Sequence, residues 1–237
     1  MDLAITTWFT LGTVGMALGT VGLLVGFTRL SEEHRLPFLD LVGVTAIATV
    51  AYALMALDVG AITSARGATL YIPRYVDWLL TTPMHIAYVA FIAGADRDTI
   101  TKLGALQAAT IVLGFAGGMV ASPLNLVLFA AGSIAFVVLV YWLYTDVGEL
   151  ATERDDMTLA LYRTLRNFVV VLWLVYPAVW LLGETGFAIM DTETVSLVVT
   201  YIDVVAKVGF GLIAYSTLRD IEFLDSSEDS VMATSAD

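Results

Sequence analysis

The sequence has no cysteine and only two histidines, His34 and His85. The absence of thiols excludes disulfide bonds and thiolate metal sites, and two histidines are too few for a histidine-only metal cluster. Charge is also scarce, since 14% of the residues are charged, against about 25% in a soluble domain. With no cysteine and only two histidines, no metal is expected. The formal net charge is −12, so no nucleic acid is expected as a partner.

Long apolar runs take the place of the missing charge. The chain is 59% hydrophobic, with a mean hydropathy of +0.85. Seven apolar stretches can be read, at about 6–28, 37–58, 71–93, 101–121, 124–144, 160–183 and 195–217. Roughly 20 apolar residues span a bilayer as a helix, whereas barrel strands are shorter and alternate with polar residues. We predict an all-α membrane protein with a seven-helix domain over 1–224 and an acidic, disordered tail over 225–237.

Positive charges predict the orientation in the cell membrane. One side of the bilayer would carry eight of them: Arg29, Arg35, Arg97, Lys102, Arg154, Arg163, Arg166 and Arg219. The opposite side has Arg66 and Arg74 near its surface. The N-terminus is therefore expected outside and the C-terminus in the cytoplasm.

Lys207 stands in the middle of the seventh stretch. It is about 15–18 Å of helix from either end, and a lysine side chain of about 6 Å cannot reach the interface. One interpretation is a structural ion pair with Asp203, one turn earlier. The other is a lysine that forms a Schiff base with an aldehyde cofactor, with Asp203 as counterion to the iminium.

A polar face runs along the third stretch. It consists of Arg74, Asp77, Thr81, His85 and Tyr88, which fall within an arc of about 80° on a helix. Such a face should point into the bundle. Arg74 and a charged Lys207 would balance the two carboxylates as a neutral quartet. An inert ion network is the alternative, but it does not explain why the polar line continues to Tyr88.

Aromatic residues share a face of the sixth stretch, where Trp173, Tyr176 and Trp180 have helical spacing and Pro177 predicts a kink. The stripe can be interhelical packing or one wall around a flat conjugated ligand. The fourth stretch adds a face made of Gln107, Thr110 and Gly114. Gly114 would leave room for a bulky neighbour.

Three segments carry a resemblance to a known family. They are 74–83 (RYVDWLLTTP), 172–181 (LWLVYPAVWL) and 203–211 (DVVAKVGFG). They resemble the third, sixth and seventh helices of archaeal microbial rhodopsins, in the same order and spacing. The resemblance implies a bacteriorhodopsin-like seven-helix bundle that carries all-trans retinal on Lys207 as a protonated Schiff base.

The resemblance also implies roles for the charged residues. Asp77 would be the primary counterion, to which the proton passes after light isomerises the retinal. Asp203 would be the second counterion and Arg74 a gate toward the outside. The residues implied to surround the retinal or its counterions are Tyr52, Trp78, Thr82, His85, Gln107, Thr110, Gly114, Phe129, Trp173, Tyr176, Pro177 and Trp180. The carboxylate of Asp77 argues against a chloride pump.

The third stretch also distinguishes a sensor from a pump. Proton pumps of the family carry an aspartate at the position of Tyr88, so the triplet here is Asp77, Thr81 and Tyr88. A phenol, with an ordinary pKa of about 10, is a poor proton donor. The pattern resembles the sensory rhodopsins, whose slow photocycles signal to a membrane transducer in phototaxis. A slow outward proton pump is the alternative, and no enzymatic activity is expected.

Three further positions refine the resemblance. Sensory rhodopsin II has threonine where this chain has Ala206, and sensory rhodopsin I has histidine where it has Phe168. Tyr201 matches the tyrosine through which sensory rhodopsin II meets its transducer. The chain therefore resembles an intermediate type, akin to the middle rhodopsins. A two-span transducer against helices six and seven is the expected partner in the bilayer, and a homo-oligomer is left open.

His85 is unusual, because relatives commonly have a small apolar residue at this position next to the retinal. One interpretation is a neutral histidine bonded to a helix carbonyl or a water. The other is a role in colour tuning or a proton relay on the cytoplasmic side.

Overall fold

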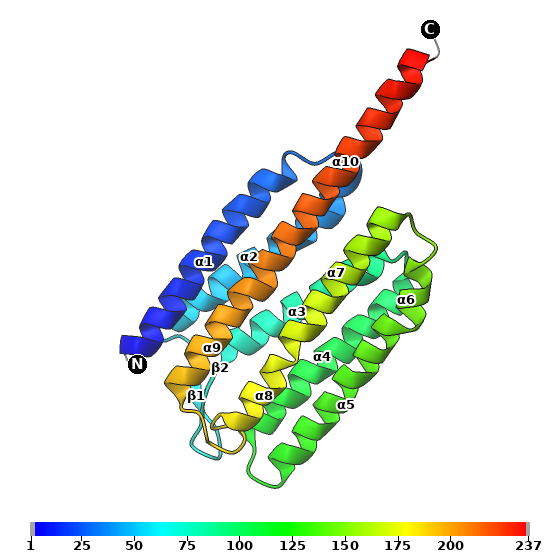
Figure 1. The fold of residues 1–237 in the computed structure, drawn as a ribbon. Coiled ribbons are helices and arrows are strands. Elements are labelled where there is room, and N and C mark those ends of the chain that lie inside the picture. The colour runs from blue at the N-terminus through cyan, green and yellow to red at the C-terminus, as the bar shows by residue number, and fades with distance from the viewer. Residues whose placement is uncertain (1–2, 236–237) are drawn as a thin grey trace.

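A computed structural model describes residues 3–235, with side chains to Leu224, and shows an all-α bundle (Figure 1). The helices and strands are α1 (Leu3–Phe27), α2 (Glu32–Ala56), β1 (Ala61–Thr63), β2 (Thr69–Tyr71), α3 (Ile72–Ile92), α4 (Arg97–Met119), α5 (Leu124–Tyr144), α6 (Asp146–Ala151), α7 (Asp156–Trp173), α8 (Val175–Leu182), α9 (Thr192–Val204), the π-helical turn η1 (Val205–Gly209) and α10 (Phe210–Ser235). The sixth spanning helix is α7 with α8, and the seventh is α9, η1 and α10. The predicted seven-helix bundle is confirmed.

Length and composition show that the chain is a multi-pass membrane protein. Six stretches are long and apolar enough to cross a bilayer: Leu3–Phe27, Glu32–Ala56, Arg97–Met119, Leu124–Ala151, Asp156–Leu182 and Thr192–Leu224. The remaining long helix, α3, carries the polar face and completes the bundle. Large apolar side chains such as Leu18, Ile134 and Val171 are exposed on the helices, as expected for surfaces that face lipid.

Three helices begin three or four residues before the predicted stretches, because an aspartate caps each of them. The carboxylates of Asp96, Asp155 and Asp191 accept hydrogen bonds of 2.7 to 2.9 Å from the backbone N–H groups three residues later, at the starts of α4, α7 and α9. An N-cap of this kind satisfies a backbone donor that the first helical turn leaves free. Polar capping residues thus lengthen helices beyond their apolar runs.

The sixth and seventh spanning helices are irregular near the predicted site. The sixth is interrupted at Leu174, between α7 and α8. Pro177 causes this break, because it has no N–H to donate to the carbonyl four residues earlier. The seventh contains η1, a π-helical turn around Lys207 that the sequence did not predict. Such turns occur often at functional sites.

Two further segments differ from the prediction. The loop after α2 forms a short antiparallel hairpin in which Ala61 pairs with Tyr71. At the opposite end, α10 continues to Ser235 and projects beyond the other helices (Figure 1), where disorder was predicted. Between Leu212 and Ser235 the chain has neither glycine nor proline, so no residue there interrupts the helix.

Two apolar clusters lie on either side of the polar residues. The larger cluster includes Tyr88, Trp173 and Phe210, and the smaller one includes Phe9 and Tyr52. Both clusters are buried. The polar residues of α3 and α9 are therefore held in surroundings that exclude water.

Candidate functional site

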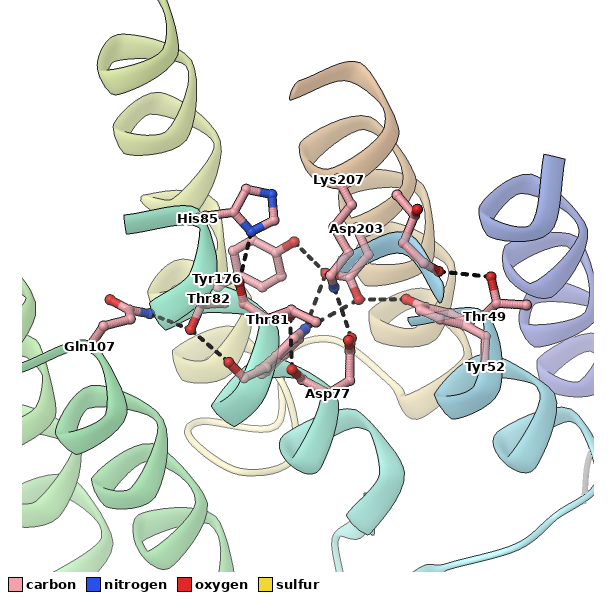
Figure 2. Close-up of polar contacts among 12 residues, drawn as sticks. Thr49, Tyr52, Asp77, Thr81, Thr82, His85, Gln107, Tyr176, Asp203 and Lys207 are labelled. Carbon is pink, nitrogen blue, oxygen red and sulfur yellow. Dashed lines mark hydrogen bonds and ion pairs between the residues drawn. The ribbon is translucent and has the colours of Figure 1, made fainter. Parts of the chain in front are cut away.

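The centre of the bundle holds a buried ion pair. Lys207 Nζ donates a hydrogen bond of 2.8 Å to Asp77 Oδ2 and lies 3.5 Å from Asp203 Oδ1 (Figure 2). Lys207 is 4% exposed, and each aspartate is 1% exposed. The three residues come from α3, α9 and η1, so the fold joins the two polar features that the sequence singled out. Removing one member would leave a buried charge without its partner, which costs about 3–5 kcal/mol.

The two aspartates have different surroundings. Asp203 accepts hydrogen bonds from Tyr52 Oη at 2.7 Å, from Tyr176 Oη at 2.6 Å and from Trp78 Nε1 at 3.1 Å. These donors stabilise the charged carboxylate. Asp77 Oδ1, in contrast, has no hydrogen-bond partner among the described residues. Asp77 therefore has a free oxygen next to Lys207, which suits it better than Asp203 to accept a proton.

Arg74 does not join these ion pairs. Its guanidinium lies over the rings of Phe9, at 5.3 Å, and Tyr71, at 5.5 Å. Within the described part of the chain, Arg74 Nε and Nη2 are buried without a hydrogen-bond partner. The neutral quartet expected from the sequence is therefore not one connected network: the ion pairs join Lys207, Asp77 and Asp203. The aromatic rings of α1 and β2 hold the arginine instead, through cation–π contacts.

The polar face of α3 is buried along its whole length. The Thr81 hydroxyl donates to the carbonyl of Asp77, and His85 Nδ1 lies 2.9 Å from the carbonyl of Thr81. Beside this face, Gln107 Nε2 donates to the Thr82 hydroxyl at 3.0 Å. Figure 2 shows these groups on one side of the ion pair and Tyr52 on the other. The helix-face prediction is therefore confirmed.

Two cavities adjoin one another beside Lys207 and share six lining residues: Trp78, Thr110, Ile111, Phe136, Tyr176 and Pro177. One cavity includes Lys207 and also Thr82, His85, Gln107 and Trp173. The other reaches Gly114, Phe129 and Trp180. Trp180 stacks on Phe129 with ring centroids 4.5 Å apart and donates to the carbonyl of Gly114. Tyr52, which the resemblance implied to bond among the counterions, lines neither cavity and donates a hydrogen bond to Asp203 as expected.

Sequence reasoning missed three residues near the site. Ile111 and Phe136 line both cavities. Both are apolar residues in apolar helices, so the sequence does not set them apart. The one signal was helical spacing, of Ile111 from Gln107 and of Phe136 from Phe129. Asp40 is a partly buried carboxylate on α2 whose charge acts on Tyr88. An acid inside an apolar stretch was a signal that could have been used.

The residues that refined the resemblance lie on the sixth and seventh spanning helices. Tyr201, on α9, is 70% exposed on the outside of the bundle. Ala206 is buried, directly before Lys207. Phe168, on α7, faces η1, since its ring end lies 3.3 Å from the point where a Cβ on Gly209 would be.

Comparison with known proteins agrees with this geometry. The profile of the family described as "Bacteriorhodopsin-like protein" matches residues 3–221. The chain is 50% identical over 234 residues to sensory rhodopsin-2 of Haloarcula vallismortis, covering 98% of this chain and 99% of that protein. It is 39% identical over 218 residues to sensory rhodopsin-2 of Natronomonas pharaonis, covering 91% of each.

The chain belongs to the bacteriorhodopsin-like family. The crystal structure of thermophilic rhodopsin from Rubrobacter xylanophilus has the same fold, with a TM-score of 0.87 and 32% identity over 91% of this chain and 96% of that one. The predicted membership of the microbial rhodopsins, close to the sensory group, is confirmed.

The residues present fit the chromophore that this family implies. A retinal is a long, apolar, conjugated molecule with an aldehyde at one end. Lys207 lines one of the two adjoining cavities, and the stacked rings of Trp180 and Phe129 line the other. Gly114 has no atom within 4 Å of its missing Cβ, so this helix face stays open toward the second cavity.

Proposed function

We propose that the protein is a photoreceptor that holds all-trans retinal on Lys207, moves a proton from Lys207 to Asp77 in the light, and signals to a membrane transducer. One observation carries the proposal: a buried lysine opens on an aromatic cavity and is hydrogen-bonded to a carboxylate with a free oxygen. The similarity of the chain to sensory rhodopsin-2 proteins supports the same function.

Bound retinal supplies the absorption of visible light and a light-driven change of shape. The protein supplies the charges around the attached nitrogen. Asp77 and Asp203 stabilise a positive charge on Lys207 Nζ, and three hydrogen-bond donors surround the Asp203 carboxylate. Asp77 Oδ2, at 2.8 Å, then takes the proton from Nζ.

The surroundings of Tyr88 favour a sensor over a pump. Tyr88 is buried in the larger apolar cluster with Val89, Leu165 and Phe210. A buried phenol among apolar side chains is a poor proton donor. Return of a proton to Lys207 from the cytoplasmic side is therefore slow, and a long-lived light-activated state gives a transducer time to respond.

A flash experiment on vesicles tests this function. The chain, reconstituted with all-trans retinal, should lose the proton from Lys207 within the photocycle and recover its initial spectrum slowly. In continuous light these vesicles should acidify or alkalise the medium only weakly. Sustained proton transport, at the turnover of a dedicated light-driven proton pump, would support the pump alternative.

The exposed ring of Tyr201 supports a transducer site on α9. The two-span transducer of a sensory rhodopsin-2 relative can serve as the probe in detergent or nanodiscs. Binding should weaken in Tyr201→Ala. Tyr141→Ala is the matched control, because Tyr141 is 62% exposed on α5, away from α9. Equal loss in both variants would argue against this surface.

A further inference from the structure

His85 has a nitrogen that the proposed mechanism does not use. The side chain is 2% exposed, and Nδ1 lies 2.9 Å from the carbonyl oxygen of Thr81. A carbonyl can only accept a hydrogen bond, so the neutral ring carries its proton on Nδ1. Nε2 is then a bare acceptor. It is buried and has no hydrogen-bond partner among the residues that the structure describes.

The ring lies on the route between Lys207 and the cytoplasmic half of the bundle. His85 and Lys207 line the same cavity. Asp77 stands eight residues earlier on α3, or about 12 Å along the helix, and Figure 2 shows it at the other end of the polar group from His85. Asp77 thus faces Lys207 from the predicted outer side, and His85 from the predicted cytoplasmic side.

The surroundings of the ring suit both of its protonation states. The carbonyl of Ala206, next to Lys207, lies close to the ring in addition to that of Thr81. A protonated ring would therefore have carbonyl oxygens as neighbours. Phe210 contacts the ring at 4.7 Å and Trp173 at 6.1 Å, both edge to face. These contacts hold the imidazole in place.

Among the described residues, few other groups near the ring can carry a proton. The charged residues that line the cavity with His85 are Lys207 and Asp203. One turn further along α3, Tyr88 packs against the same Phe210 ring at 6.0 Å. The partly buried Asp40 of α2 is near enough to Tyr88 for its charge to act on the phenol. Imidazole exchanges protons near neutral pH more readily than a phenol does.

We propose that His85 Nε2 is the atom through which a proton returns to Lys207 after Asp77 has accepted one. A proton from water on the cytoplasmic side adds to Nε2 while Nδ1–H stays bonded to Thr81. It then passes from Nε2 across the shared cavity to Lys207 Nζ, and the ring is neutral again. This inference rests on the proposed function. It assigns the return of the proton to His85, because Tyr88, buried among apolar side chains, is a poor proton donor.

The kinetic test compares His85→Leu with His34→Gln, a change at the other histidine of the chain, which is bonded to Glu222 away from the cavity. In His85→Leu the proton should still leave Lys207 after a flash, but recovery should slow at least tenfold. Azide, a small diffusible proton carrier, should restore the rate. His34→Gln should recover like the unmodified protein. Unchanged recovery in His85→Leu would overturn the inference and leave the proposed function intact.

A second test needs neither light nor retinal. With ¹⁵N-labelled histidine and His34→Gln, the retinal-free protein contains one histidine, so its NMR signals belong to His85. The expected tautomer at neutral pH has hydrogen on Nδ1 and a bare Nε2. A tautomer with hydrogen on Nε2 would overturn the inference, even if a variant at position 85 fails to fold. Failure of the unmodified protein to form a pigment would count against the proposed function itself.

Discussion

Lys207 donates a 2.8 Å hydrogen bond to Asp77, although 130 residues separate the two in the chain. Asp203, which is only one helical turn from Lys207, is the more distant carboxylate at 3.5 Å. The neighbour in sequence is held by two tyrosines and a tryptophan, whereas the distant residue keeps a free oxygen. We propose that this asymmetry gives the two carboxylates different tasks.

Replacing each aspartate by asparagine separates these tasks. Asp77→Asn should still form a pigment, but with its absorption maximum at longer wavelength, because the lost negative charge no longer localises the positive charge near Lys207. No proton should leave Lys207 after a flash.

Asp203→Asn should keep that proton transfer, but the pigment should bleach at a lower temperature than in the unmodified protein. The reason is that Tyr52 and Tyr176 lose a charged hydrogen-bond acceptor, worth about 1.5–3 kcal/mol per hydrogen bond. Time-resolved and thermal absorption spectroscopy measure both, and the opposite pattern would reverse the two assignments.

Close packing of α1 supports the donors to Asp203. A Cβ on Gly12 would lie 2.4 Å from Tyr52 Cδ1 and 2.8 Å from Thr200 Cγ2. Gly12→Ala should push Tyr52 away from Asp203 and destabilise the protein by about 1–3 kcal/mol. Gly22→Ala, on the same helix with nothing within 4 Å, is the matched control and should be neutral or slightly stabilising. Midpoints of thermal bleaching that fall equally in both variants would contradict this account.

Tyr88 offers a gain-of-function prediction. Tyr88→Asp places an acid on the cytoplasmic side of Lys207, and a positioned acid accelerates proton transfer by about 10²-fold or more. Recovery after a flash should therefore speed up, and light-driven proton transport should rise with it. Tyr88→Asn has a side chain of the same size without a proton to give, so it should not show this acceleration. Equal recovery rates in the two variants would show that position 88 does not limit the return of the proton.

Helix capping predicts a pH effect outside the membrane. Hydrogen bonds from the Thr158 hydroxyl and backbone N–H hold the pKa of Asp155 below its ordinary value of 3.8. The N–H and hydroxyl of the threonine three residues later do the same for the pKa of Asp96 and of Asp191. A lowered folded-state pKa means that this stabilisation is complete above the ordinary value and is lost as the pH falls through the lowered one.

The triple variant Asp96→Asn, Asp155→Asn, Asp191→Asn isolates this effect. Asparagine also caps helices, so the thermal midpoint at pH 7 should change little. Between pH 5 and pH 2, the unmodified protein should lose more stability than the variant. Parallel pH profiles for the two proteins would show that the caps contribute no pH dependence.

The sequence predicted which polar residues are buried in the bundle where their chemistry differed from that of their surroundings. Because charge is costly in lipid, three features could be recognised in the sequence: a lysine too deep to reach water, a carboxylate one turn away from it, and a polar helix face. Their convergence at Lys207, Asp77 and Asp203 then followed from the requirement that all three face inward. The spacing of Trp173, Tyr176 and Trp180 left interhelical packing and a ligand wall both open, and the structure places the three residues along the two cavities.

Other features depend on contacts that one helix cannot reveal. Arg74 was expected among the carboxylates, but rings from α1 and β2 hold it. Ile111 and Phe136 look like any lipid-facing residue until the helices pack. Backbone hydrogen bonding determines the π-helical turn at Lys207 and the start of α7 at its aspartate cap. The periodicity of apolar residues does not predict such details.

The attachment point of the chromophore is the central claim, and the chain makes it unusually easy to measure. Its only two lysines are Lys207 and Lys102, and Lys102 is exposed on α4, paired with Asp98. After reconstitution with all-trans retinal, reduction with borohydride should fix the chromophore on its lysine, and peptide mass spectrometry should find the adduct on Lys207. An adduct on Lys102, or none on either lysine, would contradict the account.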